Sequence, residues 1–118
     1  MTTILLIDDE PAVLRLLDRM LAPRSVNLMA VSEPFDALRI YGEQKVDLLI
    51  SDINMPEMDG TVLTNRVLEI QPETTVLLIS GNVDEMPESV SSPRVRFLRK
   101  PFFPSELLDR IRQLLPRL

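Results

Sequence analysis

The chain has 118 residues, of which 45% are hydrophobic and 26% charged, and its formal net charge is −5. This size and composition are typical of one globular domain, residues 1–118, with a hydrophobic core of its own. The absence of cysteine and histidine excludes disulfides, thiolate chemistry, histidine metal ligands and an internal phosphohistidine. The sequence shows neither a secretion signal nor an apolar run near the roughly 20 residues that span a bilayer, so we expect a cytoplasmic protein without membrane contact.

Charge is distributed unevenly along the chain. Residues 1–92 carry 6 basic and 16 acidic side chains, a balance of −10, whereas residues 93–118 carry 7 basic and 2 acidic ones, a balance of +5. The simpler interpretation is a solvated basic face, and the alternative is a surface that docks an acidic partner or a second copy. Residues 94–117 are therefore the predicted contact region for a homodimer or an effector. The acidic overall balance argues against direct binding of nucleic acid.

Apolar runs and helical periodicities alternate from one end of the chain to the other. Aliphatic runs that suit buried parallel strands lie at residues 3–7, 27–31, 47–52, 75–80 and 95–99. Helical spacing, bounded by proline or glycine, lies at residues 11–22, 34–42, 61–70 and from 104 onwards. Residues 53–60 form a predicted loop. This alternation predicts an α/β fold, with a five-stranded parallel sheet and helices on both faces.

One connection departs from this regular alternation. The segment 82–93, between the fourth and fifth predicted strands, contains two prolines and three serines. Proline lacks a backbone donor and disfavours a helix interior. We therefore expect a short turn near residues 86–90, or a loop, in place of a full fourth helix.

Polar side chains follow four of the five predicted strands. Asp8 and Asp9 come after the first strand, Asp52 ends the third, Ser80 ends the fourth and Lys100 follows the fifth. The carboxyl ends of parallel strands meet at one edge of a sheet, where ligands bind. Crowded carboxylates repel each other unless a cation joins them, and oxygen ligands suit Mg²⁺. The pattern predicts a metal-assisted phosphoryl site, the alternative being turn-forming and capping side chains with a surface lysine.

Taken together and in this order, these residues resemble the response-regulator receiver domain of two-component signalling. The likeness covers essentially the whole chain and includes Met55-Pro56, Met58-Asp59-Gly60, Ser80-Gly81 and Lys100-Pro101-Phe102. It implies a flavodoxin-like, doubly wound sheet with strand order 2-1-3-4-5. It also implies a switch rather than an enzyme that acts on other molecules, using Mg²⁺ and a phosphoryl group from a sensor histidine kinase or a histidine phosphotransfer protein.

The resemblance also implies a role for each site residue. Asp52 is the phosphoacceptor, Lys100 and Ser80 contact phosphoryl oxygens, and Mg²⁺ is held by Asp8, Asp9, Asp52 and the backbone carbonyl of Asn54. Ser80 and Phe97 are the switch residues, which act on the face formed by the fourth helical segment, the fifth strand and the last helix. Plain core packing explains Phe97 equally well. Similar domains have a cis peptide bond at Lys100–Pro101, and the alternative is an ordinary trans bond.

Asn54 and Asn82 occupy the positions that, by the same resemblance, adjust hydrolysis of the acyl phosphate. Neither is a carboxylate, so neither can serve as a general base for water. We therefore expect slow to moderate hydrolysis.

Three other functions fit a similar fold. A flavin carrier would need a phosphate cradle after the first strand, where Asp8-Asp9-Glu10 would repel phosphate. A phosphatase of the haloacid-dehalogenase type would need a second aspartate where Asn54 stands. A pseudo-receiver that binds partners without being phosphorylated is the remaining alternative, supported by the unusual segment 82–93.

Overall fold

Five parallel strands form the centre of the molecule in a computed structural model, which describes residues 1–8, 10–81, 90 and 92–118. The strands are β1 (Thr2–Ile7), β2 (Val26–Val31), β3 (Leu48–Asp52), β4 (Thr75–Ser80) and β5 (Val95–Arg99). They pair in the order β2-β1-β3-β4-β5, and every pair is parallel. Both the sheet and its predicted strand order are therefore confirmed.

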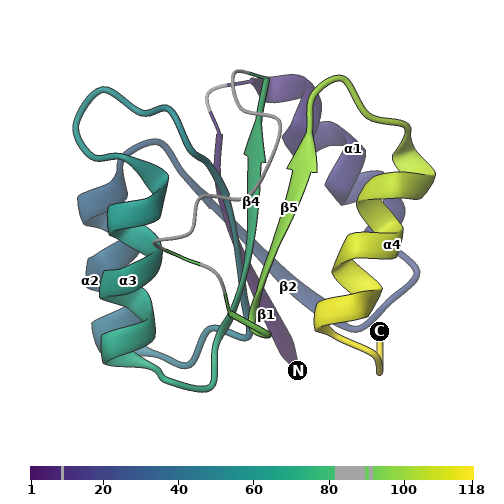
Figure 1. The fold of residues 1–118 in the computed structure, drawn as a ribbon. Coiled ribbons are helices and arrows are strands. Elements are labelled where there is room, and N and C mark those ends of the chain that lie inside the picture. Colours follow the sequence, from purple (N-terminus) through teal and green to yellow (C-terminus); the bar gives the residue numbers. More distant parts are fainter. Residues whose placement is uncertain (9, 82–89, 91) are drawn as a thin grey trace.

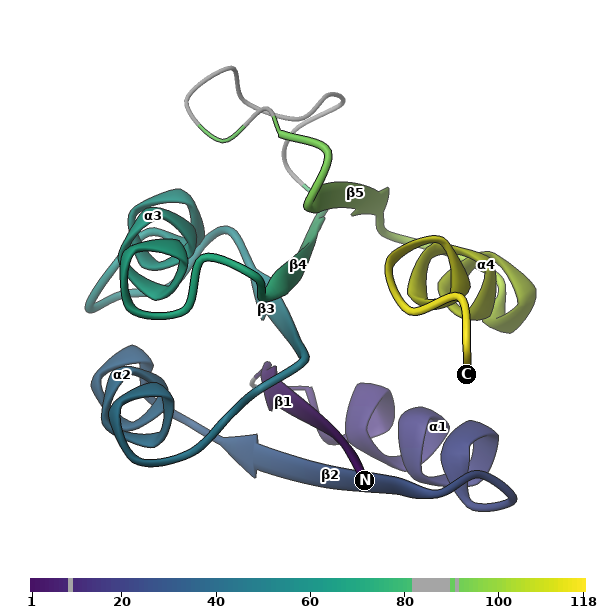
Figure 2. The same cartoon turned by 90° about the horizontal axis from the view of Figure 1, so that it is seen from below.

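Helices of the described residues cover both faces of this sheet (Figure 1). They are α1 (Pro11–Leu21), α2 (Pro34–Glu43), α3 (Gly60–Ile70) and α4 (Pro104–Leu114). Seen along the sheet, α1 and α4 lie on one side and α2 and α3 on the other (Figure 2). The predicted arrangement with helices on both faces is thus confirmed. The turn expected near residues 86–90 falls mostly on residues outside the described part of the chain, and only Val90, which is buried, is described.

Successive side chains of the strands fill two separate cores. In β1, Ile4 and Leu6 pack with α1 and α4, whereas Leu5 and Ile7 pack with α2 and α3. The same alternation holds in β4, where Leu77 and Ile79 face one side and neighbouring residues the other. Side chains of a strand point to opposite faces in turn. A run without polar residues is therefore the expected pattern for a strand covered on both sides.

The helices begin where local chemistry favours a start. Proline occupies the first turn of α1, α2 and α4, where its missing N–H costs nothing. The helix α3 begins differently, because Asp59 Oδ1 accepts a hydrogen bond from the Thr61 backbone N–H at 2.8 Å, which satisfies one unpaired donor of the first turn. The predicted bounds are wrong by one residue at several ends. For example, α3 begins at Gly60 and β3 at Leu48, because capping and ladder contacts decide the ends.

Gly60 brings the start of α3 against the end of β3. Its backbone N–H donates to the carbonyl oxygen of Ile53 at 2.7 Å. A Cβ atom on Gly60 would lie 2.8 Å from the Cα atom of Ile53 and would overlap the carbonyl oxygen of Asp52. Both neighbours are backbone atoms, so only a residue without a side chain fits here. The predicted loop-breaking glycine therefore also allows the start of α3 to lie close to the end of the strand that carries Asp52.

Candidate functional site

The sheet register brings the predicted site residues to one edge. Ile7 of β1 pairs with Ser51 of β3, and Asp52 pairs with Ile79 of β4. Ser80, also on β4, pairs with Arg99 of β5, which is the residue before Lys100. The carboxyl ends of four strands are therefore level with each other. This is the juxtaposition that the sequence predicted for Asp8, Asp52, Ser80 and Lys100.

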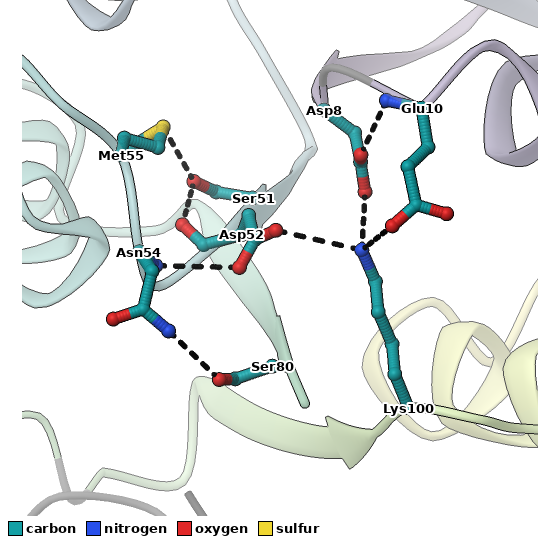
Figure 3. Close-up of polar contacts among 8 residues, drawn as sticks. All are labelled: Asp8, Glu10, Ser51, Asp52, Asn54, Met55, Ser80 and Lys100. Carbon is teal, nitrogen blue, oxygen red and sulfur yellow. Dashed lines mark hydrogen bonds and ion pairs between the residues drawn. The ribbon is translucent and has the colours of Figure 1, made fainter. Parts of the chain in front are cut away.

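Lys100 lies at the centre of the cluster and contacts three carboxylates (Figure 3). Its Nζ atom is 2.8 Å from Glu10 Oε1, 3.3 Å from Asp8 Oδ2 and 3.4 Å from Asp52 Oδ2. The side chain of Asp8 is 1% exposed, and those of Lys100 and Asp52 are 18% and 19% exposed. An ammonium group has three hydrogens to donate, so these carboxylates use its full capacity.

Burial and charge act in opposite directions within this cluster. Burial raises the pKa of Asp8 above its ordinary value of 3.8, although the Glu10 backbone N–H and the Lys100 ammonium lower it in part. For Lys100, burial lowers the pKa, but the hydrogen bond to Glu10 and the charges of Asp8, Asp52 and Glu10 together raise it above its ordinary value. The ammonium group is therefore charged throughout the physiological range, while the Asp8 carboxylate is destabilised by its burial.

This electrostatic conflict predicts a pH-dependent effect of Asp8→Asn. Because folding raises the pKa of Asp8, the ionised carboxylate is less stable in the folded chain than in the unfolded one. The contribution of the Asp8 side chain to the free energy of unfolding is favourable at low pH, where it is protonated. This contribution is lost as the pH rises through and beyond 3.8. In the presence of a chelator, Asp8→Asn is therefore expected to raise the free energy of unfolding near neutral pH.

Urea unfolding followed by circular dichroism between about pH 3 and about pH 7 measures this difference. The advantage of Asp8→Asn should grow as the pH rises. A variant that is less stable than the wild type at neutral pH would show that the bonds of Asp8 outweigh its burial.

Asn54 links Asp52 to Ser80. Its backbone N–H donates to Asp52 Oδ1 at 3.2 Å, and its side-chain amide donates to Ser80 Oγ at 3.1 Å. Ser80 is completely buried, and the Ser80 backbone carbonyl also accepts the backbone N–H of Lys100 at 3.0 Å. The hydroxyl predicted to contact a phosphoryl group is thus bonded to Asn54 in this structure, and Figure 3 shows the two side chains together.

A buried serine contacts the start of the loop that follows Asp52. Ser51 Oγ donates to the Asp52 carbonyl oxygen at 2.9 Å and lies 3.8 Å from Met55 Sδ. A small cavity of about 40 Å³ beside Asp52 is bordered by Asp8, Ser32 and residues 54–57. This loop therefore forms one wall of the space in front of the Asp52 carboxylate.

The donor set is chemically suited to Mg²⁺. Asp8 and Asp52 present carboxylate oxygens to the same ammonium group, and carboxylates and backbone carbonyls are the protein ligands that this ion prefers. Among residues 1–8, 10–81, 90 and 92–118, no group of three or more acidic, histidine or cysteine side chains is placed to hold a metal. The predicted ligand Asp9 and the predicted rate-adjusting residue Asn82 lie outside the described residues.

Two further expectations concern residues around β5. The Lys100–Pro101 peptide bond is cis, as the resemblance implied. Phe97 is half-buried and packs against the core on the α2 and α3 side of the sheet. This position accounts for Phe97 as a core residue, and its role as a switch residue stays a prediction.

Sequence reasoning missed Glu10 as a member of the cluster. Its carboxylate makes the shortest contact with Lys100, and its backbone N–H donates to Asp8 Oδ1 at 2.9 Å. The available signal was a third acidic residue directly after Asp8 and Asp9. We read it from sequence only as a residue that would repel phosphate.

Comparison with known proteins gives one consistent result. The family described as the response regulator receiver domain matches residues 4–112. The chain is 32% identical over 117 residues to the response regulator receiver protein CpdR of Brucella abortus, covering 98% of both chains. It is 33% identical over 101 residues to the transcriptional regulatory protein GlrR of Escherichia coli, covering 83% of this chain but only 22% of that protein.

Solved structures agree with this result. The receiver domain of the hybrid histidine kinase CckA is 33% identical and has a TM-score of 0.75, with 95% of this chain and 98% of that one covered. A response regulator receiver protein from Sinorhizobium medicae is 29% identical and has a TM-score of 0.84, with 98% and 95% covered. The family match spans nearly the whole of the sheet, α1, α2 and α3 in full and most of α4, and it includes every described residue of the cluster at the strand ends. On this evidence the chain belongs to the family of response-regulator receiver domains.

Proposed function

We propose that the chain is a signalling switch activated by phosphorylation of Asp52. The observation that carries this proposal is the position of Lys100, whose ammonium group lies 3.4 Å from Asp52 Oδ2 and 3.3 Å from Asp8 Oδ2. A cation beside a partly exposed carboxylate at the carboxyl edge of a parallel sheet suits transfer of a negatively charged group. Membership of the receiver-domain family supports the same function.

The proposed reaction uses Asp52 as the nucleophile. One carboxylate oxygen attacks the phosphorus atom of the donor and forms a P–O bond. The bond between phosphorus and the leaving group breaks, and its electron pair stays with the leaving group. From a phosphohistidine the leaving group is an imidazole, which takes up a proton, and from acetyl phosphate it is acetate. The chain promotes only its own phosphorylation and dephosphorylation, so it is not an enzyme that acts on other molecules.

Charge in this site is balanced by the residues already described. Lys100 supplies positive charge to a phosphoryl oxygen, and Asp8, Asp9, Asp52 and the backbone carbonyl of Asn54 would hold Mg²⁺. When bound, this ion offsets the repulsion between the carboxylate and the phosphoryl group. Asn54 is exposed beside Asp52 and offers no general base. Slow to moderate hydrolysis of the acyl phosphate therefore remains our expectation, and Asn82 is expected to contribute to the same rate.

The proposed conformational change begins at Ser80. A phosphoryl group on Asp52 would accept a hydrogen bond from the Ser80 hydroxyl, whose oxygen accepts the Asn54 amide in this structure, and movement of Ser80 would carry the end of β4 with it. Because β5 pairs with β4 along its length, the change would reach Phe97, β5 and α4. Phosphorylation would shift a pre-existing equilibrium by the difference in its affinity for the two states.

The proposed partners are of two kinds. The phosphoryl donor is a sensor histidine kinase or a histidine phosphotransfer protein, and one relative of this chain is the sensor histidine kinase RcsC of Escherichia coli. A homodimer or an effector would contact residues 94–117, where basic side chains gather on β5 and α4. No described helix is long and apolar enough to cross a membrane. We propose a cytoplasmic location, where such kinases present their phosphohistidines.

Intact-mass measurement tests this function directly. The wild-type chain is incubated with Mg²⁺ and acetyl phosphate, beside Asp52→Asn and beside a sample with chelator. We expect one added phosphoryl group on the wild type and complete loss of the adduct in both controls, because the nucleophile or the charge balance is removed. Absence of an adduct from the wild type with every donor would instead favour the second candidate, an unphosphorylated interaction scaffold.

A further inference from the structure

Glu10 occupies the outer side of the cluster around Lys100. Its side chain is 56% exposed, whereas the side chain of Lys100 is 18% exposed. Glu10 therefore lies between the ammonium group and solvent. It also borders a surface hollow of about 390 Å³ together with Val13, Lys100, Pro101 and Phe102. A phosphodonor that approaches Lys100 from this side meets the Glu10 carboxylate first.

Glu10 also makes the closest of the three contacts with the ammonium group. The distance from Nζ to Glu10 Oε1 is 2.8 Å, compared with 3.3 Å to Asp8 and 3.4 Å to Asp52. Because the three carboxylates use all three ammonium hydrogens, an arriving phosphoryl oxygen has to displace one of them. The side chains of Asp8 and Asp52 are 1% and 19% exposed, whereas that of Glu10 is 56% exposed and can turn towards solvent.

We propose that Glu10 is a positioning residue that holds Lys100 in the unphosphorylated chain and slows the reaction of Asp52 with small anionic phosphodonors. This inference rests on the proposed function. Two effects act in the same direction. Glu10 occupies a donor of Lys100 that the phosphoryl group needs, and its negative charge repels an anionic donor at the entrance to the site.

The rate of phosphorylation separates these effects from a structural role. Glu10→Gln keeps the length and shape of the side chain but removes its charge. It should accelerate labelling of Asp52 by acetyl phosphate about two- to five-fold at low ionic strength, the range expected for one partly exposed charge. The acceleration should be smaller with phosphoramidate, which is less negatively charged at neutral pH. It should also shrink as added salt screens the charge.

Glu43 provides a matched control for this substitution. It is a glutamate of nearly equal exposure, at 58%, and it also pairs with a cation, Arg39, at 3.2 Å. It lies at the end of α2, away from the cluster. Glu43→Gln changes the net charge of the chain by the same amount. It should leave both labelling rates unchanged.

A second measurement tests the Glu10–Lys100 contact without any phosphoryl transfer. The chain contains two lysines, Lys45 and Lys100, and Lys45 is 80% exposed. Trace labelling with acetic anhydride, followed by peptide mass spectrometry, gives the ratio of the two amine reactivities. Glu10→Gln should raise the Lys100 to Lys45 ratio about two- to five-fold, because the amine loses the ion pair that occupies it on its solvent side.

The outcomes distinguish this inference from the proposed function. Normal labelling of the wild type with no acceleration in Glu10→Gln would overturn the role of Glu10 and leave the switch intact. An unchanged reactivity ratio would overturn the contact itself, whatever the labelling shows. If no donor modifies the wild type, the proposed function fails and the effect of Glu10 on rate fails with it. Acceleration that persists at high salt would contradict the electrostatic explanation.

Discussion

Gly60→Ala is expected to lower the free energy of unfolding by about 1–3 kcal/mol, the usual cost of overpacking a well-packed site. The added methyl group would overlap the carbonyl oxygen of Asp52 and lie 2.8 Å from the Cα atom of Ile53. These are backbone atoms at the end of the strand that carries Asp52, the proposed phosphoacceptor, so they cannot move aside as a side chain can. The start of α3 or the end of β3 has to shift, and labelling of Asp52 should fall with it.

Gly42 is the matched control for this substitution. It lies in α2, where a Cβ atom would have no neighbour within 4 Å. Gly42→Ala should therefore be neutral or stabilise the fold by up to about 1 kcal/mol, because alanine favours a helix over glycine. Chemical unfolding measures both variants. If Gly60→Ala were as stable as Gly42→Ala, the close approach of α3 to β3 would be wrong.

Lys100→Met is expected to destabilise the folded chain by about 2 kcal/mol near neutral pH. Removing one partner of a fully buried ion pair costs about 3–5 kcal/mol, and partial exposure of Lys100 and Asp52 reduces this value. The methionine keeps an unbranched apolar side chain. The loss should therefore report the missing charge, which leaves Asp8, Glu10 and Asp52 without a shared cation.

The pH dependence of this loss gives a second check. Without the ammonium group, one influence that lowers the pKa of Asp8 disappears, so its pKa rises further above 3.8. The penalty for the ionised carboxylate is then larger near neutral pH and vanishes at low pH, where Asp8 is protonated in both states. Urea unfolding at several pH values should show the gap closing on acidification.

Lys45→Met is the control, because Lys45 is 80% exposed and its contact with Asp47 is 3.5 Å long. Exposed pairs contribute about 0–1 kcal/mol. An equal loss of stability in the two lysine variants would contradict the central position of Lys100.

The sheet could be predicted because its strands are covered on both faces. Runs such as Val76–Ile79 have no polar residue, and only a strand between two layers of helices buries such a run in full. Level strand ends then follow from parallel pairing, which is why Asp8, Asp52, Ser80 and Lys100 could be placed together. The last helix was predictable for a similar reason, since Leu107, Ile111 and Leu114 recur at helical spacing and are buried on one side of α4.

What the sequence did not reveal depends on distances between segments far apart in the chain. Glu10 and Lys100 are separated by 90 residues, and only the folded chain shows that this carboxylate, rather than Asp8 or Asp52, approaches the ammonium group most closely. The bond from Asn54 to Ser80 depends on side-chain geometry across β3 and β4. Gly60 was predictable as a breaker, but its close contact with Asp52 is a property of packing. Side-chain orientation of this kind carries no periodic signal.

The long separations around Lys100 have a consequence for synthesis of the protein. Asp8, Glu10 and Asp52 precede their common cation by 92, 90 and 48 residues. During synthesis these three carboxylates therefore leave the ribosome well before Lys100, the cation that they share. Contacts between such distant residues form late, after the entropy of closing a long loop has been overcome. A nascent chain that lacks β5 also lacks Lys100, so the three carboxylates gain their shared cation only when the sheet is complete.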